Sequence, residues 1–219
     1  SAGNGSIYCW NDTANIVIFN MQTTSMYNAF MNNQTITKAA CGPNVTDMSQ
    51  AYYNCTNLKG APVCGNNVTS MLGTYSGCAN LIGQPVCGNN VTKMASAYYN
   101  CSKLTGNPTC GPNVTNMDQT YYKCTNLNSN GYFYSNKITD VCNCFYGRNI
   151  SKKLNLYVPA SSTTLTTCLK TGSSTSLTGT DITWTNDATN NVYYNTAQNI
   201  YIYPVANVEQ TYKENELAF

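Results

Sequence analysis

The sequence predicts a repeat solenoid of about six turns, each 22–24 residues long, followed by a small β-rich cap. The first observation is a period of 23 residues that holds for two cysteine columns and one methionine column. The columns are Cys41, Cys64, Cys87 and Cys110; Cys55, Cys78, Cys101 and Cys124; and Met48, Met71, Met94 and Met117. The second observation is that "TTSMYNAFMNNQTI" and "KITDVCNCFYGRNI" continue the pattern in degenerate form on either side. Degenerate end units are typical of stacked repeats, whose first and last turns must cap the core.

Each repeat is expected to hold one short helical turn and one short strand. Apolar or sulfur-containing side chains recur three or four residues apart, which favours a short helix or an irregular helical turn over a core. In one unit they are Val91, Met94, Tyr98, Cys101 and Leu104. Gly106 and Pro108 then stop the helix. Thr109 and Cys110 are expected to form a very short strand that pairs with the same segment of the next turn.

An asparagine stands at the start of each turn, and two interpretations of it remain open. The four residues are Asn44, Asn67, Asn90 and Asn113. Their side-chain amides could form an internal ladder that bonds backbone groups left unpaired at a tight corner. Alternatively, they are exposed turn residues.

The chain divides into four predicted segments: 1–17, an N-terminal cap; 18–153, the repeat solenoid; 154–207, the β-rich cap; and 208–219, a tail or linker. In the cap, the alternating "NIYIYPV" predicts a strand ended by Pro204, and "DITWT" is a second candidate strand. A Thr/Ser-rich piece with Leu165 and Leu169 has the size of a helix. Glu209 and Lys213 lie four residues apart, which favours a helix in the tail, with a linker or an assembly arm as alternatives.

The repeated segment also carries a family resemblance. "NVTKMASAYYNCSKL" and its copies resemble the NVTxMxxMFxxCxxL repeats of BspA-like leucine-rich-repeat surface proteins, which are bacterial or phage-borne. The match covers about residues 20–150, and "LNLYVPASSTTLTTCL" is similar to the segment that closes such arrays. The resemblance implies a leucine-rich-repeat-like right-handed coil, displayed outside the cell and used in adhesion or partner binding. The chain departs from the family in its shorter unit and in a second cysteine, which replaces an aliphatic residue of the short strand.

Twelve cysteines leave a choice between disulfides and reduced core ladders. Repetition favours one disulfide per turn, pairing Cys41 with Cys55, Cys64 with Cys78, Cys87 with Cys101, and Cys110 with Cys124. Cys9, Cys142, Cys144 and Cys168 would then serve the ends. The family resemblance favours the other choice, because its members keep a reduced, buried cysteine at the "YYNC" position. The spacing matches no zinc motif, and histidine is absent from the sequence, so we expect no metal and no catalytic thiol.

Charge restricts the range of partners. Only 9% of the residues are charged, and 11 basic residues nearly balance nine acidic ones. This composition provides no electrostatic footprint for nucleic acid or anionic lipid. The longest aliphatic run, residues 16–19, is far too short to insert into a membrane. The expected partners are therefore a cell-surface glycan or protein, with possible self-association through the cap or tail.

Two classes of function remain from the sequence, neither of them enzymatic. No phosphate-binding loop, nucleophile elbow or metalloprotease helix is present, and no cofactor is expected. The leading prediction is an extracellular adhesion or binding module on a cell or virion surface, such as a bacterial adhesin or a phage tail or fibre domain. The alternative is a structural subunit of a virion, sheath or filament that self-assembles.

The second tyrosine of the repeated "YY" predicts the binding face. Tyr53, Tyr99, Tyr122 and Tyr146 occupy this position, whereas Ser76 and Met31 replace it in two other units. A position that tolerates such variation is free of core packing. The stacked tyrosines would form an exposed stripe, broken at Ser76, whose ring faces and hydroxyl groups suit sugars and proteins. The alternative is a stripe that merely packs against a neighbouring loop or subunit.

Overall fold

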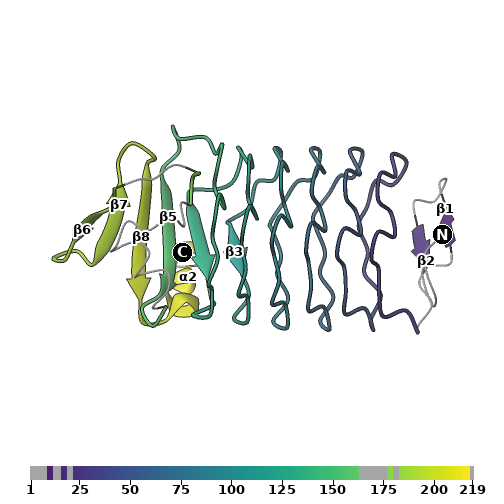
Figure 1. Cartoon of the computed structure of the whole chain (residues 1–219), viewed down its shortest axis with the longest axis horizontal. Helices are drawn as coiled ribbons and strands as arrows, with labels where there is room; N and C mark the ends of the chain where they lie inside the picture. The colour runs from purple at the N-terminus through teal and green to yellow at the C-terminus, as the bar shows by residue number, and fades with distance from the viewer. Residues whose placement is uncertain (1–8, 12–15, 19–21, 163–176, 180–182, 218–219) are drawn as a thin grey trace.

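The computed structural model describes residues 9–11, 16–18, 22–162, 177–179 and 183–217. They form a row of coils that ends in a sheet (Figure 1). The strands are β1 Cys9–Asn11, β2 Ile16–Ile18, β3 Thr109–Cys110, β4 Asn130–Phe133, β5 Leu154–Pro159, β6 Thr185–Asp187, β7 Val192–Asn195 and β8 Ile200–Val205. The helix is α2 Val208–Glu216. Among the described residues, no helix has the length and apolar character needed to cross a membrane.

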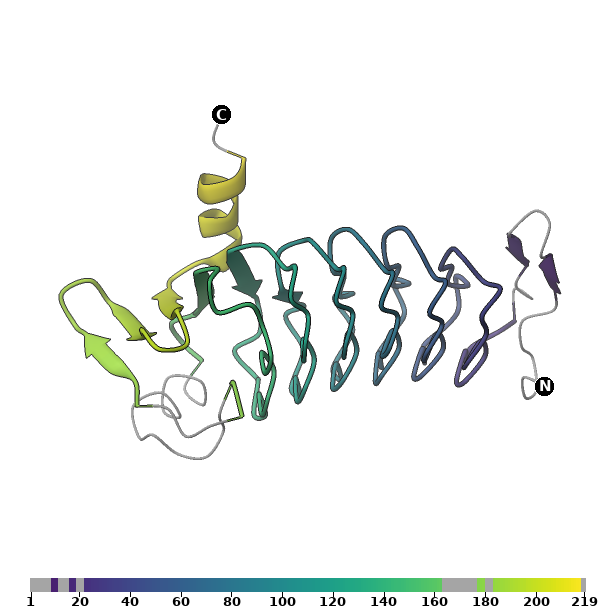
Figure 2. The same ribbon diagram turned by 90° about the horizontal axis from the view of Figure 1, so that it is seen from above.

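Successive coils lie side by side between residues 22 and 150, a region that we call the coil stack (Figure 2). Isolated parallel bridges join each coil to the next; they link, in order, Ser25, Asp47, Ser70, Lys93, Asn116 and Asp140. A parallel bridge brings the backbones of two segments to hydrogen-bonding distance. Equivalent side chains of neighbouring coils therefore stack in columns.

The predicted helical turns are wrong. Every second amide from Met94 to Asn100 donates to the next coil instead, with Met94 bonding Asn116, and Tyr98 bonding Thr120 at 3.0 Å. The amides between them donate three residues back within their own coil, as from Ala97 to Met94. An α-helix would need these amides for bonds within its own segment. The inter-coil ladder therefore replaces the helix.

Left-handed backbone makes this alternation possible. Each coil has two residues with φ between 53° and 79° placed four positions apart: Asn28 and Asn32, Gln50 and Asn54, Gly73 and Gly77, Ser96 and Asn100, Gln119 and Lys123, and Asn143 and Gly147. A single left-handed residue interrupts a right-handed helix. Asparagine and glycine hold most of these positions because they tolerate positive φ best.

A single mixed sheet of six strands follows, in the order β3-β4-β5-β8-β7-β6, while β1 and β2 form a separate antiparallel pair. The pairs from β3 through β4 and β5 to β8 are parallel, and β7 joins β8 and β6 antiparallel. The predicted fold class, a leucine-rich-repeat-like coil rich in helical turns, is therefore wrong: among the described residues the main element is a mixed six-stranded sheet, and the one helix, α2, follows the sheet. The sheet also crosses the predicted boundary at residue 153, because β3 and β4 precede it.

Several smaller predictions are confirmed. Val91, Met94, Tyr98, Cys101 and Leu104 are fully buried, as a core column requires. The predicted strand of "NIYIYPV" is β8, which alternates between buried and half-buried residues, although it continues past Pro204 to Val205. Residues 109–110 form β3 and pair in parallel with β4, but the equivalent residues 40–41, 63–64 and 86–87 are not in strands, so a strand in each repeat is wrong.

The rest of the cap agrees less well. The "DITWT" candidate is wrong where it is described, since β6 begins only at its last residue, Thr185. The piece with Leu165 and Leu169 lies outside the described residues.

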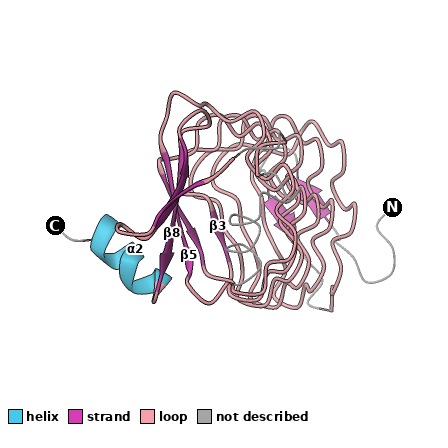
Figure 3. Cartoon of the chain, turned by 60° about the vertical axis from the view of Figure 1, so that its left-hand side comes forward, coloured by secondary structure: helices cyan, strands magenta, loops and turns pink. Residues whose placement is uncertain are grey.

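The predicted tail helix is present as α2, which packs beside the sheet (Figure 3). The Asn207 side chain accepts a hydrogen bond from the Gln210 amide and caps the helix. Glu209 and Lys213 form the expected ion pair at 3.4 Å. Glu216 then accepts hydrogen bonds from Asn130 and Tyr132, so the last turn of the helix is attached to β4.

Candidate ligand-binding site

The two tyrosines of each "YY" pair have different environments. The first, such as Tyr98, is fully buried, and its hydroxyl both donates to the Val86 carbonyl at 2.7 Å and accepts from the Val86 amide at 3.0 Å. The same arrangement recurs for Tyr52, Tyr75 and Tyr121, each bonding the residue 12 positions before it. These rings fill the core in a continuous stack. The second tyrosine is left at the surface.

The structure brings together three of the four tyrosines predicted to form the binding stripe. The Tyr99 and Tyr122 ring centroids lie 4.4 Å apart, and those of Tyr122 and Tyr146 lie 4.7 Å apart, with both pairs stacked. Tyr146 is 37% exposed, and the others are half-buried. Tyr53 lies beyond the break at Ser76. We call these four residues the tyrosine stripe.

The ring faces of the stripe are less accessible than the sequence suggests. Tyr99 covers one face of Tyr122, and Tyr146 covers the other. Gly179 lies so close to the Tyr146 ring that a Cβ atom there would collide with it. The expectation that stacked rings offer faces to sugars is therefore wrong for Tyr122, whose two faces are both covered, while Tyr146 has one face covered by Tyr122.

The break in the stripe is hollow. A surface pocket of about 390 Å³ has Tyr53 and Tyr99 among its walls, and we call it the slot. Its lining consists of Gln50, Tyr53, Leu72, Gly73, Ser76, Ser96, Tyr99 and Gln119. Ser76, which replaces the missing tyrosine, is only 6% exposed, so its short side chain leaves the space above it empty.

The sequence predicted the break but not the slot. In the sequence, only Ser76 indicated the break. Most other lining residues have a left-handed backbone, which the predicted helical turns did not anticipate; these residues are Gln50, Gly73, Ser96 and Gln119. None of the lining residues is charged. The slot therefore combines two aromatic rings with neutral amide and hydroxyl groups.

The cysteines do not form the predicted disulfides. All ten that the structure describes, including Cys41, Cys64, Cys87 and Cys110 of the first column, are free. The thiols of the second column donate to backbone carbonyls of the preceding coil at 2.9–3.0 Å: Cys55 to Phe30, Cys78 to Tyr52, Cys101 to Tyr75, and Cys124 to Tyr98. The second-column thiols therefore point toward the preceding coil, and not across their own coil toward the first-column cysteine with which each was predicted to pair. Burial raises the pKa of Cys55 to about 11, so that thiol stays protonated at neutral pH.

The asparagine ladder exists, but on the outside. The side-chain amides of Asn67, Asn90 and Asn113 each donate at 2.9 Å to a carbonyl of the preceding coil. Asn67 and Asn90 are exposed, so the ladder stabilises a surface corner rather than the core. Among the described residues, no group of acidic or cysteine side chains could hold a metal ion.

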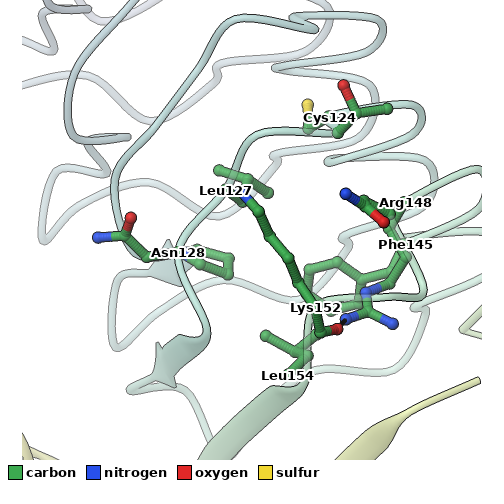
Figure 4. Close-up of a pocket in the computed structure, with 10 residues that line it drawn as sticks. Cys124, Leu127, Asn128, Phe145, Arg148, Lys152 and Leu154 are labelled. Atoms are coloured by element: carbon green, nitrogen blue, oxygen red, sulfur yellow. Dashed lines mark hydrogen bonds between the residues drawn. The ribbon is translucent and has the colours of Figure 1, made fainter.

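A second, smaller cavity lies where the coil stack meets the cap (Figure 4). It has a volume of about 20 Å³, which suffices for one water molecule. Arg148 lines it and donates to the carbonyls of Gln198 and Lys152, joining the last coil to the cap. Burial lowers the pKa of Arg148 to about 10, which leaves it charged at neutral pH. The cavity is too small for a ligand, and its role is structural.

Comparison with protein-family models, curated proteins and solved structures finds no match to this chain. The resemblance to BspA-like surface proteins therefore stays a prediction. Any functional proposal must be argued from the stripe and the slot.

Proposed function

We propose that the protein is a non-catalytic binding module that works outside the cell and holds a glycan or protein partner on the tyrosine stripe. The observation that carries this proposal is an ordered row of surface tyrosines interrupted by an uncharged slot. Tyrosine is enriched at binding surfaces because it joins a large apolar ring to a hydrogen-bonding hydroxyl group. The placement outside the cell is supported by the sequence resemblance alone.

The packing of the core column does not depend on the stripe, and this favours a role of the stripe in binding. The core already has a complete aromatic column in Tyr52, Tyr75, Tyr98 and Tyr121, whose members are fully buried. Ser76 takes the place of the outer tyrosine without disturbing that column, since Tyr75 still stacks between its neighbours at 5.5 and 5.6 Å. The outer rings are therefore available for another purpose.

The chemistry of the described residues supports a non-catalytic role. The sequence has no histidine, and burial raises the pKa of the core thiols, such as Cys110 and Cys124, to about 12. A thiol nucleophile needs the opposite shift. The slot itself holds no titratable group apart from the phenols of Tyr53 and Tyr99.

The test is attachment of the labelled full chain to a glycan array and to intact cells. We expect the double variant Tyr99→Ser with Tyr122→Ser to lose at least tenfold in attachment while keeping its melting temperature. Tyr194 and Tyr201 provide the matched control, because they also stack at the surface, 5.6 Å apart, on the sheet. Replacing that pair by serine should leave attachment unchanged. Equal attachment by both double variants would reject the stripe, and ordered self-assembly without any ligand would favour a structural subunit.

A further inference from the structure

We propose that the slot binds one neutral pyranose ring of a glycan, held between the faces of Tyr53 and Tyr99. This inference rests on the proposed function and narrows its partner from a glycan or protein to a glycan. Four features of the slot support it: its width, its floor, its lack of charge and the accessibility of its two rings.

The width of the slot follows from the coil spacing. Tyr53 and Tyr99 belong to coils on either side of the Ser76 coil, so two coil intervals separate them. The buried rings of the same coils show the size of each interval, since Tyr52 and Tyr75 lie 5.5 Å apart, and Tyr75 and Tyr98 lie 5.6 Å apart. The stacked surface rings of the following coils are closer together, with intervals of 4.4 and 4.7 Å. Two coil intervals therefore place the Tyr53 and Tyr99 rings roughly 9–11 Å apart.

This width suits a puckered ring better than a flat one. A planar aromatic ring in contact with both walls needs about 7–8 Å between them, because non-bonded carbon atoms meet at about 3.5–4.0 Å. The slot is wider than this by at least roughly 1 Å. A pyranose chair, with hydrogen atoms projecting from both faces, fills the additional space.

The floor leaves room for a ring between the walls. Gly73 and Ser76 form it, and a Cβ atom built on Gly73 would meet only the Gln50 side chain, at 3.4 Å. Gly73 also has a φ of 59°, a conformation that favours glycine over residues with larger side chains. Two small residues in one coil therefore keep the slot open.

The polar groups of the slot match a neutral, hydroxyl-rich ligand. Gln50, Ser76, Ser96 and Gln119 supply amide and hydroxyl groups that can both donate and accept hydrogen bonds. No lysine or arginine lines the slot to pair with a carboxylate or phosphate, and no acidic side chain lines it to pair with an amine. The ligand that this lining favours is an uncharged sugar rather than an acidic one.

Tyr53 and Tyr99 are also the rings of the stripe that line the slot. Tyr122 is stacked on both sides, and Tyr146 is covered by Tyr122 and Gly179. Tyr99 has one face against Tyr122, and it lines the slot together with Tyr53. The C–H groups of a sugar pack against ring faces, so the slot is the position in the stripe that suits this contact.

The experiment titrates the full chain with neutral methyl glycosides of glucose, galactose, mannose and N-acetylglucosamine and follows amide and tyrosine resonances by NMR. We expect at least one glycoside to shift the resonances of Tyr53 and Tyr99. Ser76→Tyr restores the missing ring and should weaken binding more than tenfold, whereas Ser76→Ala should change it less than threefold. Tyr53→Ala, which removes one wall without filling the slot, should also weaken binding tenfold or more.

Comparison ligands make the inference refutable. Tighter binding of p-cresol, a flat ring, or of the acidic methyl glucuronide than of every neutral glycoside would overturn it. So would unchanged sugar binding by a folded Ser76→Tyr variant. If Ser76→Tyr leaves array attachment intact while the serine double variant abolishes it, the stripe binds a partner elsewhere and this inference fails alone. If the wild-type chain attaches to nothing but still binds a neutral glycoside in the slot, the adhesion role fails and the sugar site stands.

Discussion

Removing one buried hydroxyl group should reveal how the core tyrosines stabilise the coils. Tyr98→Phe deletes the group that bonds both the amide and the carbonyl of Val86, at 3.0 and 2.7 Å. The ring is fully buried, so the phenylalanine keeps its packing against Tyr75 and Tyr121. Val86 would lose partners for two backbone groups, each worth about 1–3 kcal/mol when left unsatisfied. Because Val86 is only half-buried and water can reach part of it, we expect a loss of about 2–4 kcal/mol.

The assay is urea unfolding under reducing conditions, with the slope of the transition compared between variants. Tyr27→Phe is the control, since Tyr27 is 57% exposed and should change the free energy of unfolding by less than about 0.5 kcal/mol. A loss below about 1 kcal/mol for Tyr98→Phe, at an unchanged slope, would show that the hydroxyl contributes little beyond what water supplies.

Two further predictions concern the backbone and the thiols. Lys123 has a φ of 55°, and Lys123→Gly should raise the free energy of unfolding by about 0.5–1 kcal/mol, because the left-handed conformation costs most residues about 1–2 kcal/mol and glycine much less. Lys123→Ala, matched in lost side-chain contacts, should bring no such gain in urea unfolding. Burial raises the pKa of Cys55 to about 11 and of Cys124 to about 12 from an ordinary value of 9.0. The folded state thus holds these protons more tightly, so stability is complete below pH 9 and falls as the pH rises toward 12. A melting temperature that rises or stays constant between pH 9 and 11 would contradict this account.

The sequence predicted the columns of the core but not the backbone that presents them. Met94 and Tyr98 are large apolar residues that repeat at a fixed offset, and this combination was enough to predict that they are buried. The same spacing of three or four residues fits a helix equally well, and this ambiguity produced the wrong helical turns. The distinguishing signal was weak, because Ser96 and Gln119 hold left-handed positions without being glycine or asparagine.

The candidate site shows the same division. Variation at the outer tyrosine position was readable from Ser76 and led to the stripe. The slot was not readable, since it depends on Gly73 and on side chains from neighbouring coils that only the inter-coil register brings together. The disulfides were predicted from the number and regular spacing of the cysteines, which do not show in which direction each side chain points. In the structure, the Cys78 thiol donates to the carbonyl of Tyr52 in the preceding coil and does not reach across its own coil to Cys64.

The inter-coil ladder also makes the protein modular in whole units. In the segment from Met94 to Asn100, and in the equivalent segment of the other coils, every second amide donates a hydrogen bond to the following coil. Carbonyls of the same segment accept hydrogen bonds from the preceding coil. Every coil therefore has one edge of amide donors and one edge of carbonyl acceptors. In the last coil, the Phe145 amide donates to the Leu177 carbonyl at 2.7 Å. Adding or deleting one complete 23-residue unit leaves matching edges, whereas half a unit would leave a row of donors without acceptors. A change of one whole unit would therefore lengthen or shorten the coil stack by one coil interval and leave its two ends unaltered.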